Sequence, residues 1–261
     1  MRKTTRIAIV TGALALSAVA VPAAQADSAV GDTKITKISV NAGKDIVVGT
    51  TEKKTVTISV TATDDSGIKR ATAMLWHGSD FDAENGIDGS AVPSADWGSC
   101  TVVDATTSTC KITVVVDPKK NIYGNILAGK WKVWALAQGN DADKVQKNEA
   151  GSAYVKRASR LSTNASPEPV KKGKTITVTG ALTRANWDTS KYAGYTSQSV
   201  KLQYKKKGAS SYTTLKTVKS GSAGALKTTV TASADGYFRY SFAGTSTTPA
   251  VTATSDFVDV R

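Results

Sequence analysis

One glycine-containing stretch of the chain carries carboxylates at short intervals. Asp80, Asp82, Glu84 and Asp88 supply side-chain oxygens, and the glycines beside them let the backbone fold back on itself. Because Ca²⁺ takes roughly six to eight oxygen ligands, the stretch is a candidate calcium site. Its spacing is not that of an EF-hand, because the central glycine and the closing glutamate of that motif are out of place.

Loops elsewhere in the same half of the chain could complete a calcium shell if they lie at the same end of the fold. The carboxylates available there are Asp64, Asp65, Asp141 and Asp143. The alternative is that acidic, glycine-rich turns are ordinary surface loops, and it stays open.

A second candidate site is basic and lies in the other half. Lys205, Lys206 and Lys207 stand between two alternating segments, where a turn is expected. Trp187 and Tyr192 fall in predicted loops close to basic residues, and exposed rings in loops often anchor partners. These five residues are the candidate binding set. The alternative is a solvated lysine turn with rings that cap the end of a sandwich.

The charge is divided unevenly along the chain. Residues 27–158 hold sixteen Lys/Arg and sixteen Asp/Glu, whereas residues 159–261 hold fifteen and five. An asymmetry of this size favours an anionic partner for the second half, such as an anionic cell-envelope polymer or an acidic secreted protein. The sequence disfavours nucleic acid, because no aromatic-and-basic motif of a nucleic-acid-binding module is present.

The sequence holds few candidate catalytic residues. His77 is the only histidine, and no motif supplies it with a nucleophile. Two loop carboxylates could still converge for glycoside hydrolysis, although nothing marks which two. The sequence therefore predicts a protein that is not an enzyme, with no cofactor apart from calcium.

The N-terminus predicts export. Residues 1–26 contain a positive segment, a short apolar segment and an Ala-Gln-Ala cleavage site, as a signal peptide does. The apolar segment is shorter than the roughly 20 residues that span a bilayer, and no later segment is long enough. Cys100 and Cys110 are the only cysteines, and in an extracellular protein we expect them to form a disulfide across a hairpin.

The elements that position these residues are predicted to be strands throughout. Alternation with a period of two recurs in short runs, as in residues 55–62 and 175–180, and turn residues separate the runs. Each half yields about seven strands, the number expected for an immunoglobulin-like sandwich. A polar, proline-containing stretch places the boundary near residue 158. The fold predicted is all-β, with two tandem antiparallel sandwiches at 27–158 and 159–261.

Four motifs in the second half resemble a bacterial immunoglobulin-like module that recurs in secreted actinomycete proteins. They are residues 167–180, 192–194, 203–208 and 242–244. The resemblance implies an accessory domain without catalytic residues. The first half is similar, more loosely, to bacterial sandwich domains of unknown function with an Asp-Asp-Ser-Gly turn, here residues 64–67. Such domains are sometimes labelled calcium-binding.

Together these features predict a secreted, extracellular, non-catalytic protein that binds a partner or has a structural role at or near the cell surface through its basic second half. Two alternatives remain. One is a calcium-binding secreted protein, and the other is a secreted inhibitor or an adaptor subunit of an extracellular protein assembly.

Overall fold

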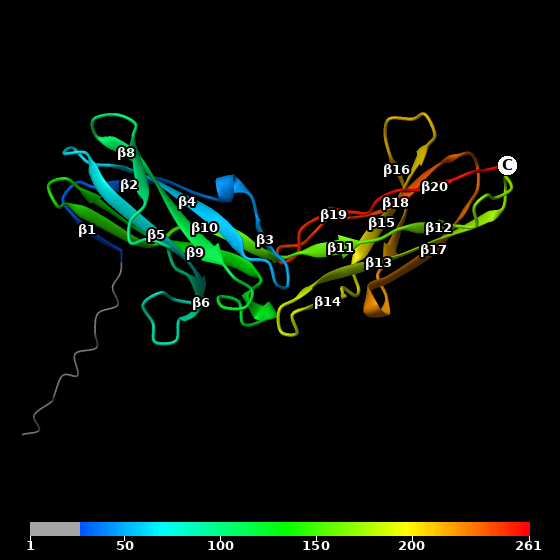
Figure 1. Ribbon diagram of the computed structural model, residues 1–261, viewed down its shortest axis with the longest axis horizontal. Coiled ribbons are helices and arrows are strands. Elements are labelled where there is room, and N and C mark those ends of the chain that lie inside the picture. The colour runs from blue at the N-terminus through cyan, green and yellow to red at the C-terminus, as the bar shows by residue number, and fades with distance from the viewer. Residues whose placement is uncertain (1–26) are drawn as a thin grey trace, which may run out of the picture.

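The computed structural model describes residues 27–261, and in that range strands dominate (Figure 1). The helical segments of this range are three short 3-10 turns, η1 (Asn41–Gly43), η2 (Asn125–Leu127) and η3 (Ser222–Gly224). None of them is long and apolar enough to cross a membrane. The predicted all-β fold with two sandwiches is confirmed. The predicted signal peptide, residues 1–26, lies outside the described residues.

The N-terminal sandwich has two sheets. The larger has the order β1-β10-β9-β5-β6, with β3 beside β10. Its strands are β1 (Ser28–Val30), β3 (Ile46–Val48), β5 (Ile68–Gly78), β6 (Ile87–Ala91), β9 (Gly129–Gly139) and β10 (Lys144–Arg157). The smaller has the order β2-β4-β8-β7, made of β2 (Lys34–Val40), β4 (Lys54–Thr63), β7 (Ser99–Val102) and β8 (Thr107–Val116). The pairs are antiparallel except β3 with β10.

Alternation along the strands fills the space between these two sheets. Val56, Ile58 and Val60 of β4 point to one face and are buried, as successive residues of a strand point to opposite faces. β9 lies between β10 and β5 and contributes the buried residues Trp131 and Val133 to the core. β9 is therefore a central strand of its sheet.

The disulfide predicted between Cys100 and Cys110 is formed. The two residues lie directly opposite each other on β7 and β8. Cys110 is buried in the core of the N-terminal sandwich, so the bridge fastens the edge strand β7 to the packed strand β8.

The C-terminal sandwich also has two sheets. In one, β13 pairs with β11, β12, β14 and β17, and its strands are β11 (Ser159–Leu161), β12 (Asn164–Ser166), β13 (Thr175–Asn186), β14 (Lys191–Gly194) and β17 (Ala225–Thr231). The other has the order β16-β15-β18-β19, with β20 beside β18. Its strands are β15 (Ser199–Lys206), β16 (Thr213–Lys219), β18 (Gly236–Phe242), β19 (Val251–Thr252) and β20 (Asp256–Val258). Ile176, Leu202 and Tyr240 are among its buried residues.

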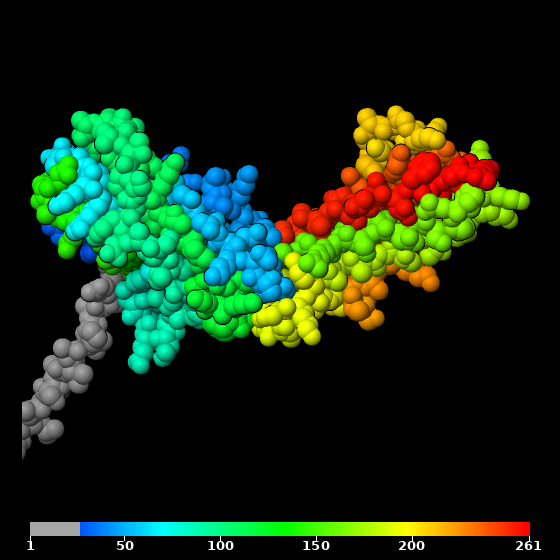
Figure 2. All heavy atoms as spheres, in the orientation of Figure 1, coloured from blue at the N-terminus to red at the C-terminus, as the bar shows by residue number. Residues whose placement is uncertain are grey.

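The two sandwiches meet at a packed junction. Ala185 and Trp187, at the end of β13, belong to the apolar cluster of the N-terminal sandwich rather than to that of the C-terminal one. The Trp187 ring is 4% exposed, and its indole N–H donates to the carbonyl of Gly49 over 2.9 Å. Figure 2 shows the segment around Gly49 against the region of β14. Residues on the far side of the predicted boundary at 158 therefore complete the first core.

Replacing Trp187 with alanine is expected to destabilise the protein by about 3 kcal/mol, because a buried ring leaves a cavity and Gly49 loses a hydrogen bond. Trp97→Ala is the matched control, since that ring is 37% exposed, and it should cost about 1 kcal/mol or less. Urea unfolding followed by circular dichroism measures both. Equal losses in the two variants would contradict a packed junction.

Candidate functional site

The Lys205–Lys207 turn lies where the sequence predicts it, at the end of β15. Lys206 and Lys207 are exposed and Lys205 is half-buried. The Lys207 ammonium lies 3.4 Å from the carboxylate of Asp235 and 5.5 Å from the centre of the Phe257 ring. The hydrogen bond from the backbone N–H of Val260 is the largest of the effects that lower the pKa of Asp235, and Lys207 adds to it.

Aromatic rings continue the turn into a larger surface on the same sheet. Lys205 lies 5.2 Å from the ring centres of both Tyr212 and Tyr237, and the Arg239 guanidinium lies 3.6 Å from that of Tyr212. Tyr237 in turn contacts Phe257, with 5.1 Å between ring centres. We call this surface the cation–aromatic stripe. It consists of Lys205, Lys207, Tyr212, Tyr237, Arg239 and Phe257.

Strand register explains why the stripe forms. Lys205 pairs with Tyr237 and Gln203 pairs with Arg239, so these side chains share one face of the sheet, while Phe238 and Tyr240 occupy the buried face. Gln203 accepts a hydrogen bond from Arg239 Nε over 2.9 Å, which orients the guanidinium. Tyr237 and Arg239 are not among the residues that the sequence predicts for binding. Their alternation with Phe238 and Tyr240 is the signal that could have identified them.

Few acids neutralise this face. In the part of the C-terminal sandwich that the structure describes, two ion pairs form, Lys207 with Asp235 and Arg261 with Asp259. Lys205, Lys206 and Arg239 form none, so their charges are available to a partner. The excess of positive charge that the sequence places in this half is thus present at an accessible sheet face.

Trp187 and Tyr192 lie elsewhere, and this corrects their expected position in exposed loops. Trp187 is buried at the junction, and Tyr192, in β14, packs against the N-terminal core with the Arg160 guanidinium 3.5 Å from its ring centre. β14 lies beside the junction, while the turn between β15 and β16 projects away from it (Figure 1). The two rings and the lysine turn therefore do not form one surface.

The carboxylates predicted to bind calcium at residues 80–88 are not gathered. Asp82 accepts a hydrogen bond from the Asn148 amide over 2.6 Å, and Asp88 lies 2.5 Å from Nδ1 of His77. Phe81 packs on Trp76 and Trp134, which holds the loop against the outer face of the larger sheet. The loop is thus anchored by a ring, and Asp82 and Asp88 have protein partners. Calcium binding there stays a prediction.

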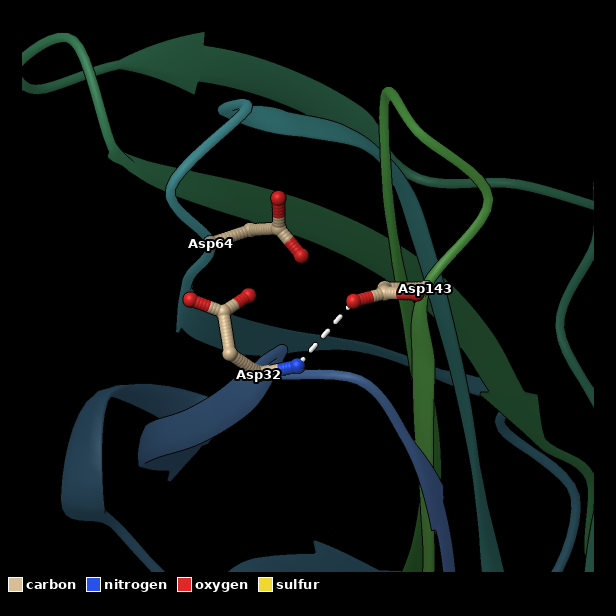
Figure 3. A group of neighbouring side chains, drawn as sticks. All are labelled: Asp32, Asp64 and Asp143. Carbon is tan, nitrogen blue, oxygen red and sulfur yellow. Dashed lines mark hydrogen bonds between the residues drawn. The ribbon is translucent and has the colours of Figure 1, made fainter.

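Other carboxylates do meet at one end of the N-terminal sandwich. Asp64 lies within reach of Asp32 and Asp143 in one group (Figure 3). It lies within reach of Asp65 and Asp141 in a second group. Asp143 accepts a hydrogen bond from the backbone N–H of Asp32 over 3.1 Å. Like charges act on Asp65, whose pKa is raised by Asp32 first, then by burial, and then by Asp141 and Asp64.

Asp64 is the buried member of this cluster, at 2% exposure. Its carboxylate accepts hydrogen bonds from the Thr33 hydroxyl and from the N–H and hydroxyl of Ser66, at 2.9 and 2.5 Å for the latter two. Burial is the largest single effect and raises its pKa, but the hydrogen bonds from Ser66 and Thr33 together outweigh it, so the pKa lies below its usual value. The carboxylate is therefore ionised and satisfied within the fold.

One part of the chain matches the model of a protein family. Residues 41–137 match the model of a family of unknown function (DUF5707). No curated protein matches the sequence.

Similar solved structures include three distant ones. The D0-D1 domain of intimin is 13% identical, with 86% of this chain and 98% of that one covered and a TM-score of 0.28. A chimeric titin Z1Z2 carrying a decorin peptide is 10% identical, with 92% and 98% covered and a TM-score of 0.25. A DUF4785 family protein from Legionella pneumophila is 13% identical, with 84% and 54% covered and a TM-score of 0.34. These likenesses assign no function.

Removing the Asp64 carboxylate should cost about 1 to 3 kcal/mol, because Thr33 and Ser66 then lose their buried acceptor. The lowered folded-state pKa stabilises the fold above the unfolded value of about 4, and this stability is lost as the pH falls through the folded-state pKa. Urea unfolding at a series of pH values should thus show a shallower acid-side slope for Asp64→Ala than for the parent. The exposed Asp96→Ala is the control, and a slope identical in all three proteins would contradict the assignment.

Proposed function

We propose that the protein is a secreted, non-catalytic binding protein at or near the cell surface, and that its C-terminal sandwich binds an anionic cell-envelope polymer. The observation that carries the proposal is the cation–aromatic stripe, where Lys205 and Arg239 lie against rings and, within residues 27–261, form no ion pair. The site is thus the predicted lysine turn, extended along its own sheet and without Trp187 and Tyr192.

The arrangement of the stripe suits a polyanion. A cation over an aromatic ring is attracted to the ring face and held there. It keeps its positive charge, which can still attract an anion from solution. The contacts run without a break from Arg239 through Tyr212, Lys205 and Tyr237 to Phe257. A row of fixed positive charges on a sheet face can contact repeated negative groups of one polymer, and its field steers that polymer to the site.

Export is part of the proposal. The Cys100–Cys110 disulfide suits an oxidising compartment, which is where a signal peptide would deliver the chain. The stripe would then face the outer surface of the cell envelope. An acidic secreted protein is the second kind of partner that the same charges suit, which is how the protein would act as an inhibitor or an adaptor subunit.

The test is binding of the purified protein to isolated cell envelopes at increasing salt. We expect binding at low ionic strength that is lost at high ionic strength, because exposed charges are screened. Changing Lys205, Lys206 and Lys207 together to serine should weaken binding by roughly tenfold to a hundredfold, by analogy with about 1 kcal/mol for each basic residue at an anionic membrane surface.

The control variant removes three lysines from another part of the same sandwich. Lys171, Lys172 and Lys174 are exposed in the connection between β12 and β13, and their change to serine lowers the net charge by the same amount. This variant should retain most of the binding. An equal loss of binding in the two variants would show that binding depends on net charge alone. No binding at any salt concentration would overturn the proposal.

A further inference from the structure

Two arginines come together at the junction, where the end of β10 meets the connection between β18 and β19. Arg157 is 7% exposed, and its Nε–H donates to the carbonyl of Ala185 over 2.6 Å. Arg184, on β13, is half-buried over the Tyr195 ring, with 3.7 Å from the guanidinium carbon to the ring centre. Both are fastened to one turn, because the Arg157 backbone N–H donates to Thr247 and the Arg184 side chain donates to Thr248.

No carboxylate neutralises this pair. Within residues 27–261, no Asp or Glu forms an ion pair with either guanidinium. Asp188 is the acid whose charge acts on Arg157, and its carboxylate is engaged by Asn125. Burial first, and then the charge of Arg184, lowers the pKa of Arg157 to about 10, so the group stays protonated at neutral pH. Two partly desolvated positive charges thus act on each other at the junction, an arrangement that is costly without a counter-charge.

Hydrogen-bond donors at this place remain unused. Among the described residues, the Arg157 side chain donates one hydrogen bond, from Nε to Ala185, and its two terminal amino groups have no acceptor. Neither amino group is among the fully enclosed polar atoms that lack a partner in this range, so both reach the surface. The Thr247 and Thr248 hydroxyls accept from Arg184, which fixes one of its terminal amino groups against the 245–248 turn.

We propose that Arg157 and Arg184 form a binding site for an oxyanion, the phosphate or carboxylate group of a small ligand or of a chain end. The terminal amino groups of a guanidinium are spaced to bind two oxygens of such a group at once. The second terminal amino group and the Nε–H of Arg184 supply further donors. The oxyanion would contact β10 of one sandwich and β13 of the other, so its binding would strengthen the junction.

The first test compares thermal unfolding of the mature protein in chloride, inorganic phosphate and acetate at equal ionic strength. A ligand present at about a hundred times its dissociation constant should raise the midpoint by about 5 °C. A rise in phosphate alone identifies a phosphate site, and a rise in acetate alone identifies a carboxylate site. Equal midpoints in the three salts would overturn the proposal.

Two variants show whether the effect belongs to this pair. Arg184→Gln removes one of the two charges and should abolish the rise. Arg70→Gln is the matched control, because Arg70 also lies over a ring, that of Trp97, and also has its Nε bonded to an oxygen. Arg70→Gln should keep the full rise in the unfolding midpoint. Loss of that rise in both variants would show general anion binding instead.

A measurement on the unaltered protein covers the case in which Arg184→Gln folds poorly. In a ¹⁵N–¹H NMR titration with phosphate or acetate, the side-chain Nε–H signals of Arg157 and Arg184 should shift together and saturate, while that of Arg70 stays in place. Unchanged Arg157 and Arg184 signals would overturn the site without recourse to any variant.

Discussion

The indole of Trp187 is the contact on which the arrangement of the two sandwiches depends. It leaves the end of β13, enters the core of the N-terminal sandwich and donates a hydrogen bond to Gly49. A single chain connection at residue 158 would leave two sandwiches free to turn against each other. Burying a large ring of one sandwich in the core of the other ties their orientation to the stability of that core. Tyr192, stacked on Arg160, extends the same contact.

This junction also separates the charged surfaces. The acidic cluster around Asp64 lies at the loops of the N-terminal sandwich, Arg157 and Arg184 lie at the junction, and the cation–aromatic stripe lies on the C-terminal sandwich. Asp64 is satisfied by hydroxyl and N–H donors of its own loops, whereas Arg239 and Lys205 have rings and an amide for neighbours. The first set of charges is therefore used within the fold, and the second is directed outward.

The elements that the sequence predicts are those marked by a local alternation of apolar and polar residues. Val56, Ile58 and Val60 identify β4, and Cys100 and Cys110 identify a bridged hairpin. β10 is harder to find, because polar residues and Gly151 obscure the alternation in its first half, where the structure has an irregularity between Lys147 and Gly151. The short strands β1 and β3 pair with the distant strand β10 and carry too few residues for a pattern.

Long-range contacts decide where the residues of the candidate sites lie. Trp187 was interpreted as an exposed loop residue because nothing near it in sequence shows that Gly49 lies beside it, although Ala185 and Trp187 continue an alternation that could have indicated burial. The 80–88 loop was interpreted by its acids, whereas Phe81 decides its position by packing on Trp134. The lysine turn was found because three adjacent lysines are a local signal, but Tyr237 and Arg239 join it only through strand pairing.

The proposed partner is anionic and meets the C-terminal sandwich on the face that carries the stripe. Hydrogen exchange of the mature protein, with and without isolated cell envelopes at low salt, examines this contact on the unaltered chain. We expect slower exchange in β15, β18 and the turn between β15 and β16, with no change in the 80–88 loop. Protection confined to the N-terminal sandwich, or none at all, would contradict it.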